Sequence, residues 1–524
     1  VWSDFEYLAE ETVLAACWRS AVSALGAVGT VDAVPLPTGL RATLRPYQVR
    51  GFEWLAFLWR HRLGGILADD MGLGKTLQAL ALVVHAREGA DAASMGSPDA
   101  ASSAGPAPAA TAPPFLVVAP ASVVANWAQE AARFTPGLVV RTIGSTQATS
   151  GTALAEATAG ADIVVTSYTI FRLDFEAYQA NAWAGLILDE AQFVKNHASR
   201  LHECARDLDA PFKLAITGTP MENHLLELWS LFAVTAPGLF PSARLFTEQY
   251  RNPIENGGSP EALAKLRRRI RPLMLRRTKA LVATELPAKQ EQELRIELSP
   301  AHQQLYDTFL QRERQKLMGL IDDIDRNRII FFRSLTLLRM LSLDPSLIDE
   351  QYAGMGSSKL DALLEQLDDV VAEGHRALVF SQFTSFLGKA AERLDAAGIE
   401  YCYLDGSSTR RAEIVQRFKA GAAPVFLISL KAGGFGLNLT EADYVFLLDP
   451  WWNPATETQA VDRTHRIGQT RNVMVYRLIA AGTIEEKVMA LKQRKAQLFD
   501  SVLDDGAEFG EALTADDIRG LLEE

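Results

Sequence analysis

The sequence is poor in cysteine and lacks long apolar runs. It has three cysteines in 524 residues, Cys17, Cys204 and Cys402. They lie too far apart for a disulfide framework or a zinc pattern, which favours a reducing, cytoplasmic compartment. No apolar run approaches the roughly 18 residues that a membrane helix needs, so the sequence excludes a membrane-spanning protein. It shows no signal peptide, and with Val1 in the first position we expect a fragment of a longer chain.

Positive charge is also scarce. The chain has 52 Lys and Arg against 64 Asp and Glu, a net charge of −12. An acidic chain is not a general binder of polyanions, so any contact with nucleic acid must come from a local basic stretch. The composition, 48% hydrophobic and 22% charged, is that of a globular protein. At about 150 residues per domain, the length predicts three or four structural units.

Short apolar strands alternate with helical segments in two stretches, about 41–240 and 355–500. Continuous apolar runs of this kind are typical of parallel strands that helices cover on both faces. The expected strands are 64–68, 115–119, 163–166, 186–188 and 213–217 in the first stretch, and 377–381, 401–404, 425–429, 444–448 and 473–478 in the second. The sequence therefore predicts an α/β fold with two parallel-sheet lobes.

Three other segments differ in composition from the lobes. Residues 1–40 form a helical lead-in that ends near two prolines, residues 241–354 are helical and charged, and residues 501–524 form a tail. Within the first lobe, Ala, Pro, Ser and Gly fill 21 of the 25 positions from 90 to 114. Such a segment cannot bury enough surface to fold, so we expect a flexible insertion there.

A glycine-rich loop follows the first expected strand and precedes a helical segment. This is the context of a P-loop, where backbone N–H groups and a helix start bind phosphate. Lys75 would reach the β and γ phosphates of ATP, and the Thr76 hydroxyl would bind Mg²⁺. Asp69 stands where the strict pattern has glycine, so an ordinary helix start is the alternative. The loop consists of Ala68, Asp69, Asp70, Met71, Gly72, Leu73, Gly74, Lys75 and Thr76.

Two carboxylates, Asp189 and Glu190, end the expected strand 186–188. Ligands bind at this edge of an open α/β sheet. Asp189 can hold Mg²⁺, and Glu190 can orient and deprotonate an attacking water. The alternative is an acidic helix cap, which the helix dipole favours at any helix start.

With these sites, the order of motifs from about 44 to 486 resembles the Swi/Snf family of superfamily-two helicase-like ATPases. The stretch 44–51 is similar to the motif that reads adenine, with Gln48 on the base. Segments similar to the first-lobe nucleic-acid motifs are 118–122, with Asn126 and Trp127, and 166–168. Residues 217–220, with Asn223, resemble the motif that couples hydrolysis to lobe movement.

The second stretch continues the resemblance. Residues 379–383 and 405–409 are similar to motifs that grip the nucleic-acid backbone. Residues 429–440 resemble the fifth motif and 459–469 the sixth. The sixth implies that Arg463 and Arg466 are arginine fingers and that His465 is structural.

The resemblance implies two RecA-like lobes that bind ATP and Mg²⁺ between them, in a compact motor similar to bacterial members. The implied function is translocation on double-stranded DNA, with possible action on a DNA-bound protein complex and a nucleoid-associated, cytoplasmic location. The implied catalytic residues are Lys75, Asp189, Glu190, Arg463 and Arg466. The implied nucleotide contacts are Gln48, Asp70, Met71, Gly72, Leu73, Gly74, Lys75, Thr76 and Gly436, and the implied metal ligands are Thr76 and Asp189.

Rival functions share these motifs. They are a strand-separating helicase, an ATPase that remodels a transcription complex, and a nucleotide sensor without catalysis. The basic stretch 267–279 could bind phosphate or form a salt-bridged linker. The stretch 338–345 departs from the Cys-Asn-His-Pro ending that is usual in the family. This departure puts in doubt the remodelling subclass and leaves the ATPase residues untouched.

Overall fold

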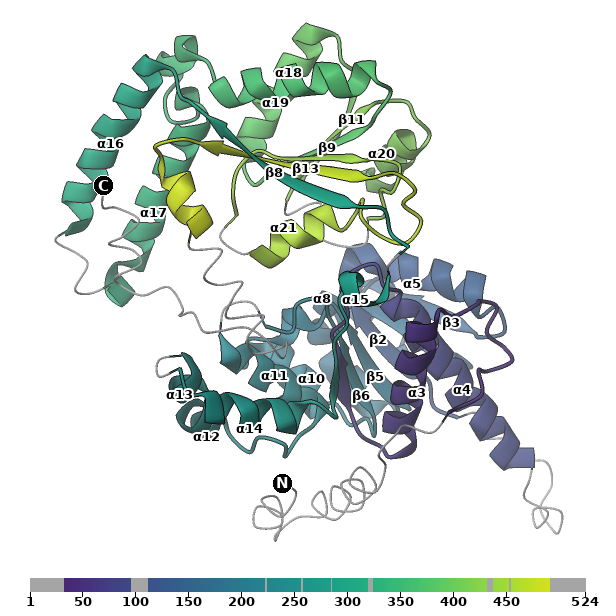
Figure 1. Ribbon diagram of the computed structural model, residues 1–524. Helices are drawn as coiled ribbons and strands as arrows, with labels where there is room; N and C mark the ends of the chain where they lie inside the picture. The colour runs from purple at the N-terminus through teal and green to yellow at the C-terminus, as the bar shows by residue number, and fades with distance from the viewer. Residues whose placement is uncertain are drawn as a thin grey trace, which may run out of the picture. The chain divides into compact units, whose positions relative to one another are not determined.

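The computed structural model divides the chain into two compact units, Val1–Thr284 and Glu285–Glu524 (Figure 1). It describes residues 33–95, 112–221, 224–255, 258–283, 285–318, 324–430, 437–451 and 454–490. The lead-in to residue 32, the core of the expected insertion, Asn223, Gly436 and the tail therefore lie outside the described residues. Within the described ranges, no helix is both long enough and apolar enough to cross a membrane.

The first unit contains a parallel sheet with the strand order β3-β4-β2-β5-β6-β1-β7. All five strands expected in this lobe are present, within one residue at either end. The expected list lacked β3, in which two of four side chains are exposed, and the two-residue β7. The strands are β1 (Gly65–Leu67), β2 (Phe115–Ala119), β3 (Val140–Ile143), β4 (Ile163–Ser167), β5 (Gly185–Asp189), β6 (Lys213–Ile216) and β7 (Met274–Leu275).

Helices cover both faces of this sheet, and its central strands are therefore buried along their whole length. One face carries α3 (Pro46–Arg60), α4 (Lys75–Met95) and α5 (Ala121–Phe134), and the other carries α8 (Tyr168–Leu173), α10 (Arg200–Asp207) and α11 (Leu225–Thr235) (Figure 1). The helix α4 continues to Met95 and so extends into the stretch 90–114 that was expected to be a loop.

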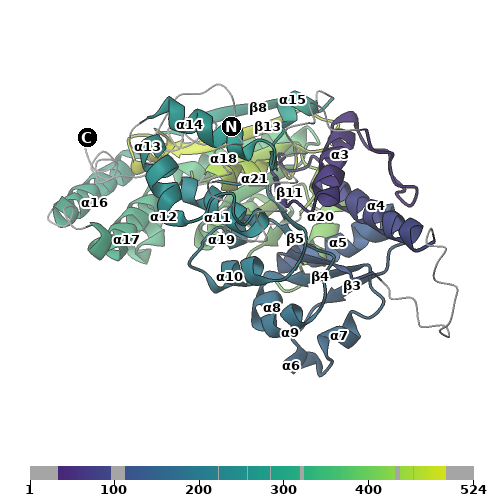
Figure 2. The same cartoon turned by 90° about the horizontal axis from the view of Figure 1, so that it is seen from below.

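Smaller helices complete the first unit. Figure 2 shows α6, α7, α8 and α9 grouped beside β3 and β4. These and the later short helices are α6 (Gln147–Ser150), α7 (Leu154–Ala157), α9 (Phe175–Ala180), η2 (Ala191–Val194), α12 (Ala243–Phe246), η3 (Thr247–Arg251), α13 (Asn252–Glu255), α14 (Pro260–Ile270) and α15 (Lys279–Val282).

The second unit has its own parallel sheet, with the strand order β10-β11-β9-β12-β13-β8. Five of its strands were expected, but β8 lies in the stretch 241–354 that was expected to be helical. The sequence of β8 is polar because it is an edge strand, paired only with β13 in a register that aligns Lys289 with Val473. The strands are β8 (Lys289–Ile296), β9 (Ala377–Ser381), β10 (Tyr401–Leu404), β11 (Val425–Ser429), β12 (Tyr444–Leu447) and β13 (Val473–Ala480). The two sheets confirm the α/β fold with two parallel-sheet lobes.

Two apolar cores lie on the two faces of this second sheet. One packs α18 (Ser358–Ala372) and α19 (Thr384–Ala397) on the sheet, and they lie above it in Figure 1. The other packs α20 (Arg411–Lys419) and α21 (Pro454–Val461) on the opposite face. Side chains alternate between these two cores along β9, β10, β11 and β12, as the period of a β-strand requires.

A helical pair and two 3₁₀ turns precede α18. The pair, α16 (Pro300–Met318) and α17 (Ile324–Leu343), lies side by side in both views (Figures 1 and 2). The turns are η5 (Pro345–Leu347) and η6 (Glu350–Met355). A core that includes Tyr306, Leu338 and Val488 joins the pair to the segment after β13. Both helices lie within the stretch 241–354 that was expected to be helical and charged.

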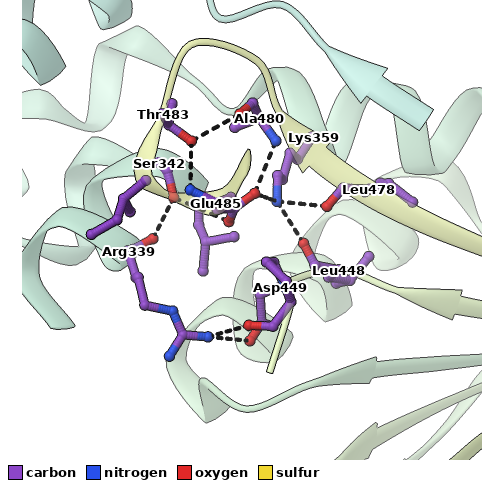
Figure 3. A network of polar contacts seen from close by, with 12 residues as sticks. Arg339, Ser342, Lys359, Leu448, Asp449, Leu478, Ala480, Thr483 and Glu485 are labelled. Atoms are coloured by element: carbon purple, nitrogen blue, oxygen red, sulfur yellow. Dashed lines mark hydrogen bonds and ion pairs between the residues drawn. The ribbon is translucent and has the colours of Figure 1, made fainter. Parts of the chain in front are cut away.

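A buried polar network connects α17 and α18 to the ends of the strands (Figure 3). Lys359 donates to the carbonyls of Leu448 and Leu478 at 2.7 and 2.9 Å, and its ammonium lies 2.5 Å from the Glu485 carboxylate. Nearby, Arg339 lies 3.8 Å from the Asp449 carboxylate and donates to Gln382 Oε1 at 3.1 Å. The network ties the helical pair to the loops that follow β9 and β12.

Candidate nucleotide-binding site

The glycine loop leads from β1 into α4 in the geometry of a P-loop. Gly72 and Gly74 have φ angles of 84° and 77°, in the left-handed region where glycine is favoured. A Cβ at Gly74 would lie 2.5 Å from Gln48 Nε2, so no larger residue fits without movement. Lys75 opens α4, and its ammonium donates to the carbonyls of Asp69 and Asp70 at 2.6 and 3.1 Å. The lysine is therefore folded over the loop that would bind the phosphates.

Gln48 lies in the first turn of α3, directly against this loop. It is buried, its Nε2 donates to the Leu73 carbonyl at 3.1 Å, and its Oε1 accepts from the Arg45 N–H at 2.9 Å. Tyr47 donates to the same Leu73 carbonyl at 3.1 Å. Gln48 Nε2 thus supports the P-loop and Gln48 Oε1 caps the start of α3, and contact with adenine stays a prediction.

Asp69, the departure from the strict P-loop pattern, is fully buried and forms an ion pair with Arg277. The Arg277 guanidinium also donates to Gln78 Oε1 at 2.8 Å, and its carbon lies 5.3 Å from the centre of the Tyr47 ring. The residues before and after Arg277 also contact the residues around Asp69. The strand β7 pairs with β1, and the Lys279 N–H donates to Asp70 Oδ2 at 2.8 Å. For Arg277, the structure supports the salt-bridged role of the basic stretch.

Asp189 and Glu190 end β5 at the edge where the P-loop follows β1. Asp189 Oδ2 accepts a hydrogen bond from Trp127 Nε1 at 2.7 Å, and Oδ1 accepts one from the Glu190 N–H at 3.0 Å. Burial and, to a lesser extent, the neighbouring Glu190 carboxylate together raise the pKa of Asp189 to about 7, although the Trp127 hydrogen bond and the charge of Lys75 oppose the shift. In the part of the chain that the structure describes, no Lys or Arg nitrogen lies within 4.0 Å of this carboxylate.

Glu190 adopts a left-handed backbone conformation, with φ 52° and ψ 55°, which is costly for a residue with a side chain. Its Oε2 accepts from Gln192 Nε2 at 3.0 Å, and Gln192 Oε1 in turn accepts from the Thr217 hydroxyl at 2.9 Å. A Cβ at Gly218 would lie 3.0 Å from Met71 Cγ in the P-loop. The loops after β1, β5 and β6 therefore meet, as parallel strands of one sheet require.

These residues fit ATP and Mg²⁺ by their chemistry. The loop offers glycines with left-handed backbone and a lysine, and Asp189 offers a buried carboxylate that forms no ion pair within 4.0 Å among the described residues. Among the described residues no cluster of three metal-binding side chains occurs. In nucleotide sites, one or two carboxylates plus substrate phosphates usually bind Mg²⁺, so a full protein cage is not required.

In the second unit, Arg463 and Arg466 both donate to the Leu437 carbonyl, at 3.5 and 3.3 Å. Arg463 is buried and Arg466 is half-buried. His465 forms a hydrogen bond from its Nε2 to the Pro287 carbonyl at 2.9 Å, which fits the structural role that the sequence analysis assigned to it. Gly436 lies outside the described residues, so its predicted nucleotide contact has no structural description.

Residues 405–409, which were expected to grip the nucleic-acid backbone, form a compact turn after β10. The Asp405 carboxylate accepts from the Ser407 N–H and hydroxyl at 2.9 and 2.7 Å, and the Ser408 hydroxyl lies 3.2 Å from it. The Ser407 hydroxyl is the main reason why the pKa of Asp405 is lowered. The turn leaves Gly406 and Ser407 exposed.

Sequence reasoning missed three contacts at this site, made by Trp127, Arg277 and Gln192. Trp127 was grouped with the nucleic-acid motifs, and nothing in its spacing showed that its indole reaches Asp189. Arg277 lies 208 positions from Asp69 in the chain. Asp69 itself was the available signal, because a carboxylate buried in such a loop is strongly destabilising for folding unless a cation neutralises it.

A glycine loop, its lysine and a carboxylate pair at one sheet edge define a nucleotide-binding ATPase of the P-loop class. Comparison with known families then narrows the class. The model of the SNF2-related domain matches residues 47–347, and that of the helicase conserved C-terminal domain matches residues 358–468. The chain therefore belongs to the SNF2-related family of helicase-like ATPases.

Two curated relatives illustrate this membership, and one solved structure is also similar to the chain. A Bacillus subtilis protein named as an ATP-dependent helicase/translocase, YwqA, is 36% identical over 496 residues, 93% of this chain and 51% of that protein. The TATA-binding protein-associated factor mot1 of Aspergillus fumigatus is 34% identical over 534 residues, 91% of this chain and 28% of that protein. The chain thus spans about half of the first relative's length and less of the second. The Sulfolobus solfataricus SWI2/SNF2 ATPase core in complex with dsDNA has 31% identity and a TM-score of 0.44, over 90% of this chain and 95% of that one.

Proposed function

We propose that this chain is an ATP-driven motor that moves along double-stranded DNA and thereby remodels protein–DNA complexes. The observation that carries the proposal is the chain of contacts from Glu190 through Gln192 to Thr217, beside the P-loop lysine. Phosphoryl transfer depends on positioning and charge neutralisation, and this edge of the sheet supplies groups for both. It also links the hydrolytic carboxylate to the motif whose counterpart couples hydrolysis to movement.

Each polar group at this edge has a distinct part in the proposed reaction. Lys75 would bind the β and γ phosphates of ATP, while Asp189 and the Thr76 hydroxyl would hold Mg²⁺, which neutralises phosphate charge when bound. Glu190 would orient the attacking water and accept its proton. Arg463 and Arg466 would stabilise the charge that develops on the γ-phosphate, as arginine fingers do.

The proposed track is duplex DNA, gripped through its phosphates. Contacts to phosphate need no exposed bases, so a motor can step along an intact helix. Separating the strands would instead cost roughly 1.4 kcal/mol per base-pair step in lost stacking. Binding through phosphates releases counterions, so ATPase stimulation by DNA should fall steeply as salt rises.

The first experiment compares ATP hydrolysis with duplex DNA, single-stranded DNA and RNA. We expect the largest stimulation with duplex DNA, and displacement of the third strand from a triplex without release of either duplex strand. Efficient release of a strand from a forked duplex, with no triplex displacement, would overturn the proposal in favour of a strand-separating helicase.

The chemistry is tested by Glu190→Gln. We expect this variant to retain ATP binding and to lose turnover by roughly 100-fold or more, as for removal of a general base. Glu203→Gln is the control, because Glu203 is a half-exposed residue of α10 whose carboxylate contacts Arg200 at the surface. Equal turnover of the two variants would contradict the role of Glu190.

A second candidate is an ATPase that remodels a transcription complex. It is favoured by the relative named a TATA-binding protein-associated factor, which contains a matching region in 28% of its length. Such a function would use the same motor, with partner contacts made by another segment. It predicts that a DNA-bound protein is released on ATP hydrolysis only when a partner-binding segment is fused to the motor.

A further inference from the structure

Trp127 connects an exposed helix start to the carboxylate at the end of β5. It lies on α5, whose first residues, Ala121 and Ser122, are exposed, while the indole is 1% exposed. Its Nε1–H donates to Asp189 Oδ2 at 2.7 Å. The helix therefore has one end at the surface and one side chain on the carboxylate that would hold the metal.

A second hydrogen bond reaches Asp189 from a different helix. Tyr168, the first residue of α8, donates from its hydroxyl to the Asp189 carbonyl at 2.8 Å. The Tyr168 ring is buried and stacks on Phe193 with 5.0 Å between ring centres and 17° between planes. The segments that begin α5 and α8 are the two that resemble first-lobe nucleic-acid motifs. Each of them contains a side chain that donates a hydrogen bond to Asp189.

Three hydrogen bonds fix different parts of Asp189. The Trp127 indole sets the direction of Oδ2, and the Glu190 N–H sets that of Oδ1. Tyr168 holds the main chain from which the carboxylate projects. Each carboxylate oxygen has a second lone pair, which is left for a metal ion or its water. A shift of α5 or α8 would thus turn the metal-binding lone pairs without any change in Asp189 itself.

We propose that Trp127 and Tyr168 are positioning residues that hold Asp189 for Mg²⁺ and transmit DNA binding to the ATP site. Duplex DNA bound at the start of α5 would restrain this helix and, through the indole, the carboxylate. The inference rests on the proposed function, because it assumes that Asp189 holds the metal of a DNA-stimulated ATPase. Residues that orient a metal ligand typically contribute about 10- to 100-fold in metal affinity or activity.

The test replaces Trp127 by Phe, which keeps an aromatic ring and removes the N–H. Trp183→Phe is the matched control, since Trp183 is 3% exposed in the same unit and donates its Nε1–H to the Tyr178 carbonyl at 2.7 Å. For each variant of this chain, ATPase is measured against Mg²⁺ concentration and against duplex DNA, together with the melting temperature.

We expect Trp127→Phe to need roughly tenfold more Mg²⁺ for half-maximal ATPase and to lose most of the stimulation by DNA. Trp183→Phe should lower the melting temperature to a similar degree and leave both dependences unchanged. Indistinguishable Mg²⁺ and DNA dependences in the two variants would refute the proposal and reduce Trp127 to a core residue.

A second variant keeps the proposal testable if Trp127→Phe does not fold. Tyr168→Phe removes one oxygen, retains the ring on Phe193 and is expected to shift the Mg²⁺ and DNA dependences in the same direction, by a few-fold. Unchanged dependences in Tyr168→Phe would then refute the inference. Failure of the proposed function looks different, because the wild-type chain would show no DNA-stimulated ATPase at all.

Discussion

Two buried charges in the first unit are held differently from two in the second. In the first, Asp189 is buried with no Lys or Arg nitrogen within 4.0 Å among the described residues, and Lys213 is buried against the carbonyls of Ala205 and Arg206. In the second, Lys359 is paired with Glu485, and Asp449 lies near Arg339. A buried charge without a partner is unfavourable for folding, so it persists where function requires it or where main-chain dipoles are enough.

The aspartates show this difference most clearly. Burial raises the pKa of Asp189 to about 7, and it raises that of Asp449 to about 6, where the Arg339 guanidinium opposes the shift. Asp69 in the P-loop resembles Asp449 rather than Asp189, because Arg277 neutralises it. The comparison separates carboxylates that hold the fold together from the one that is left open to a cation.

The largest expected effect concerns the second unit's arginines. Arg466 donates to the Leu437 carbonyl, whereas Arg339 is buried and lies 3.8 Å from the Asp449 carboxylate. We expect Arg466→Ala to lower ATP turnover by roughly 10³-fold, about 4 kcal/mol, with little change in melting temperature. Steady-state ATPase and thermal unfolding measure both. An Arg466→Ala protein with wild-type kinetics would show that Arg466 is not an arginine finger.

Breaking the Lys359–Glu485 pair should mainly affect stability. Lys359→Met leaves the Glu485 carboxylate buried without its cation, which costs about 3 kcal/mol or more. We expect a large fall in the urea midpoint of the transition that reports the second unit. The double variant Lys359→Met with Glu485→Gln should recover most of the loss, since a neutral amide still accepts from the Ala480 N–H. If the double variant recovers no stability, the loss in Lys359→Met comes from the packing of the lysine side chain and not from its charge.

The same substitution in the two units should give opposite results. Asp189→Asn should reduce turnover by roughly 100-fold or more and leave the melting temperature equal or higher, because a desolvated charge is removed. Asp449→Asn should lower the melting temperature, because Arg339 and the Ser381 hydroxyl lose a charged partner. ATPase rate and melting temperature are measured for both variants. A lower melting temperature for Asp189→Asn would contradict the difference between the two aspartates.

The smallest effect is a pH dependence carried by Lys213. Burial lowers its pKa to about 8 from an ordinary value of 10.5. Between these values the unfolded chain binds the proton and the folded chain does not, so stability rises with pH in this window. The expected slope is on the order of 1 kcal/mol per pH unit, and Lys213→Met should remove it. Urea unfolding at pH 8, 9 and 10 gives the slope, and equal slopes in both proteins would show that Lys213 stays protonated.

Much of the fold could be predicted because its signals are local. Ten strands were expected from short apolar runs, and each is present in the two sheets. The strands that escaped, β3, β7 and β8, lie at sheet edges and are short or polar. An edge strand buries less surface, so its sequence carries a weaker pattern.

The sequence by itself determined the candidate nucleotide site as far as local order allows. Strand ends and glycines place Lys75 and Asp189 at one edge of the first sheet, because parallel strands share their direction. Only the tertiary structure decided which carboxylate is neutralised by a cation. Arg277 reaches Asp69 across 208 positions, and Trp127 reaches Asp189 across 62. Such contacts depend on how helices pack on the sheet. Packing selects the direction of each side chain, and a local sequence pattern does not contain this information.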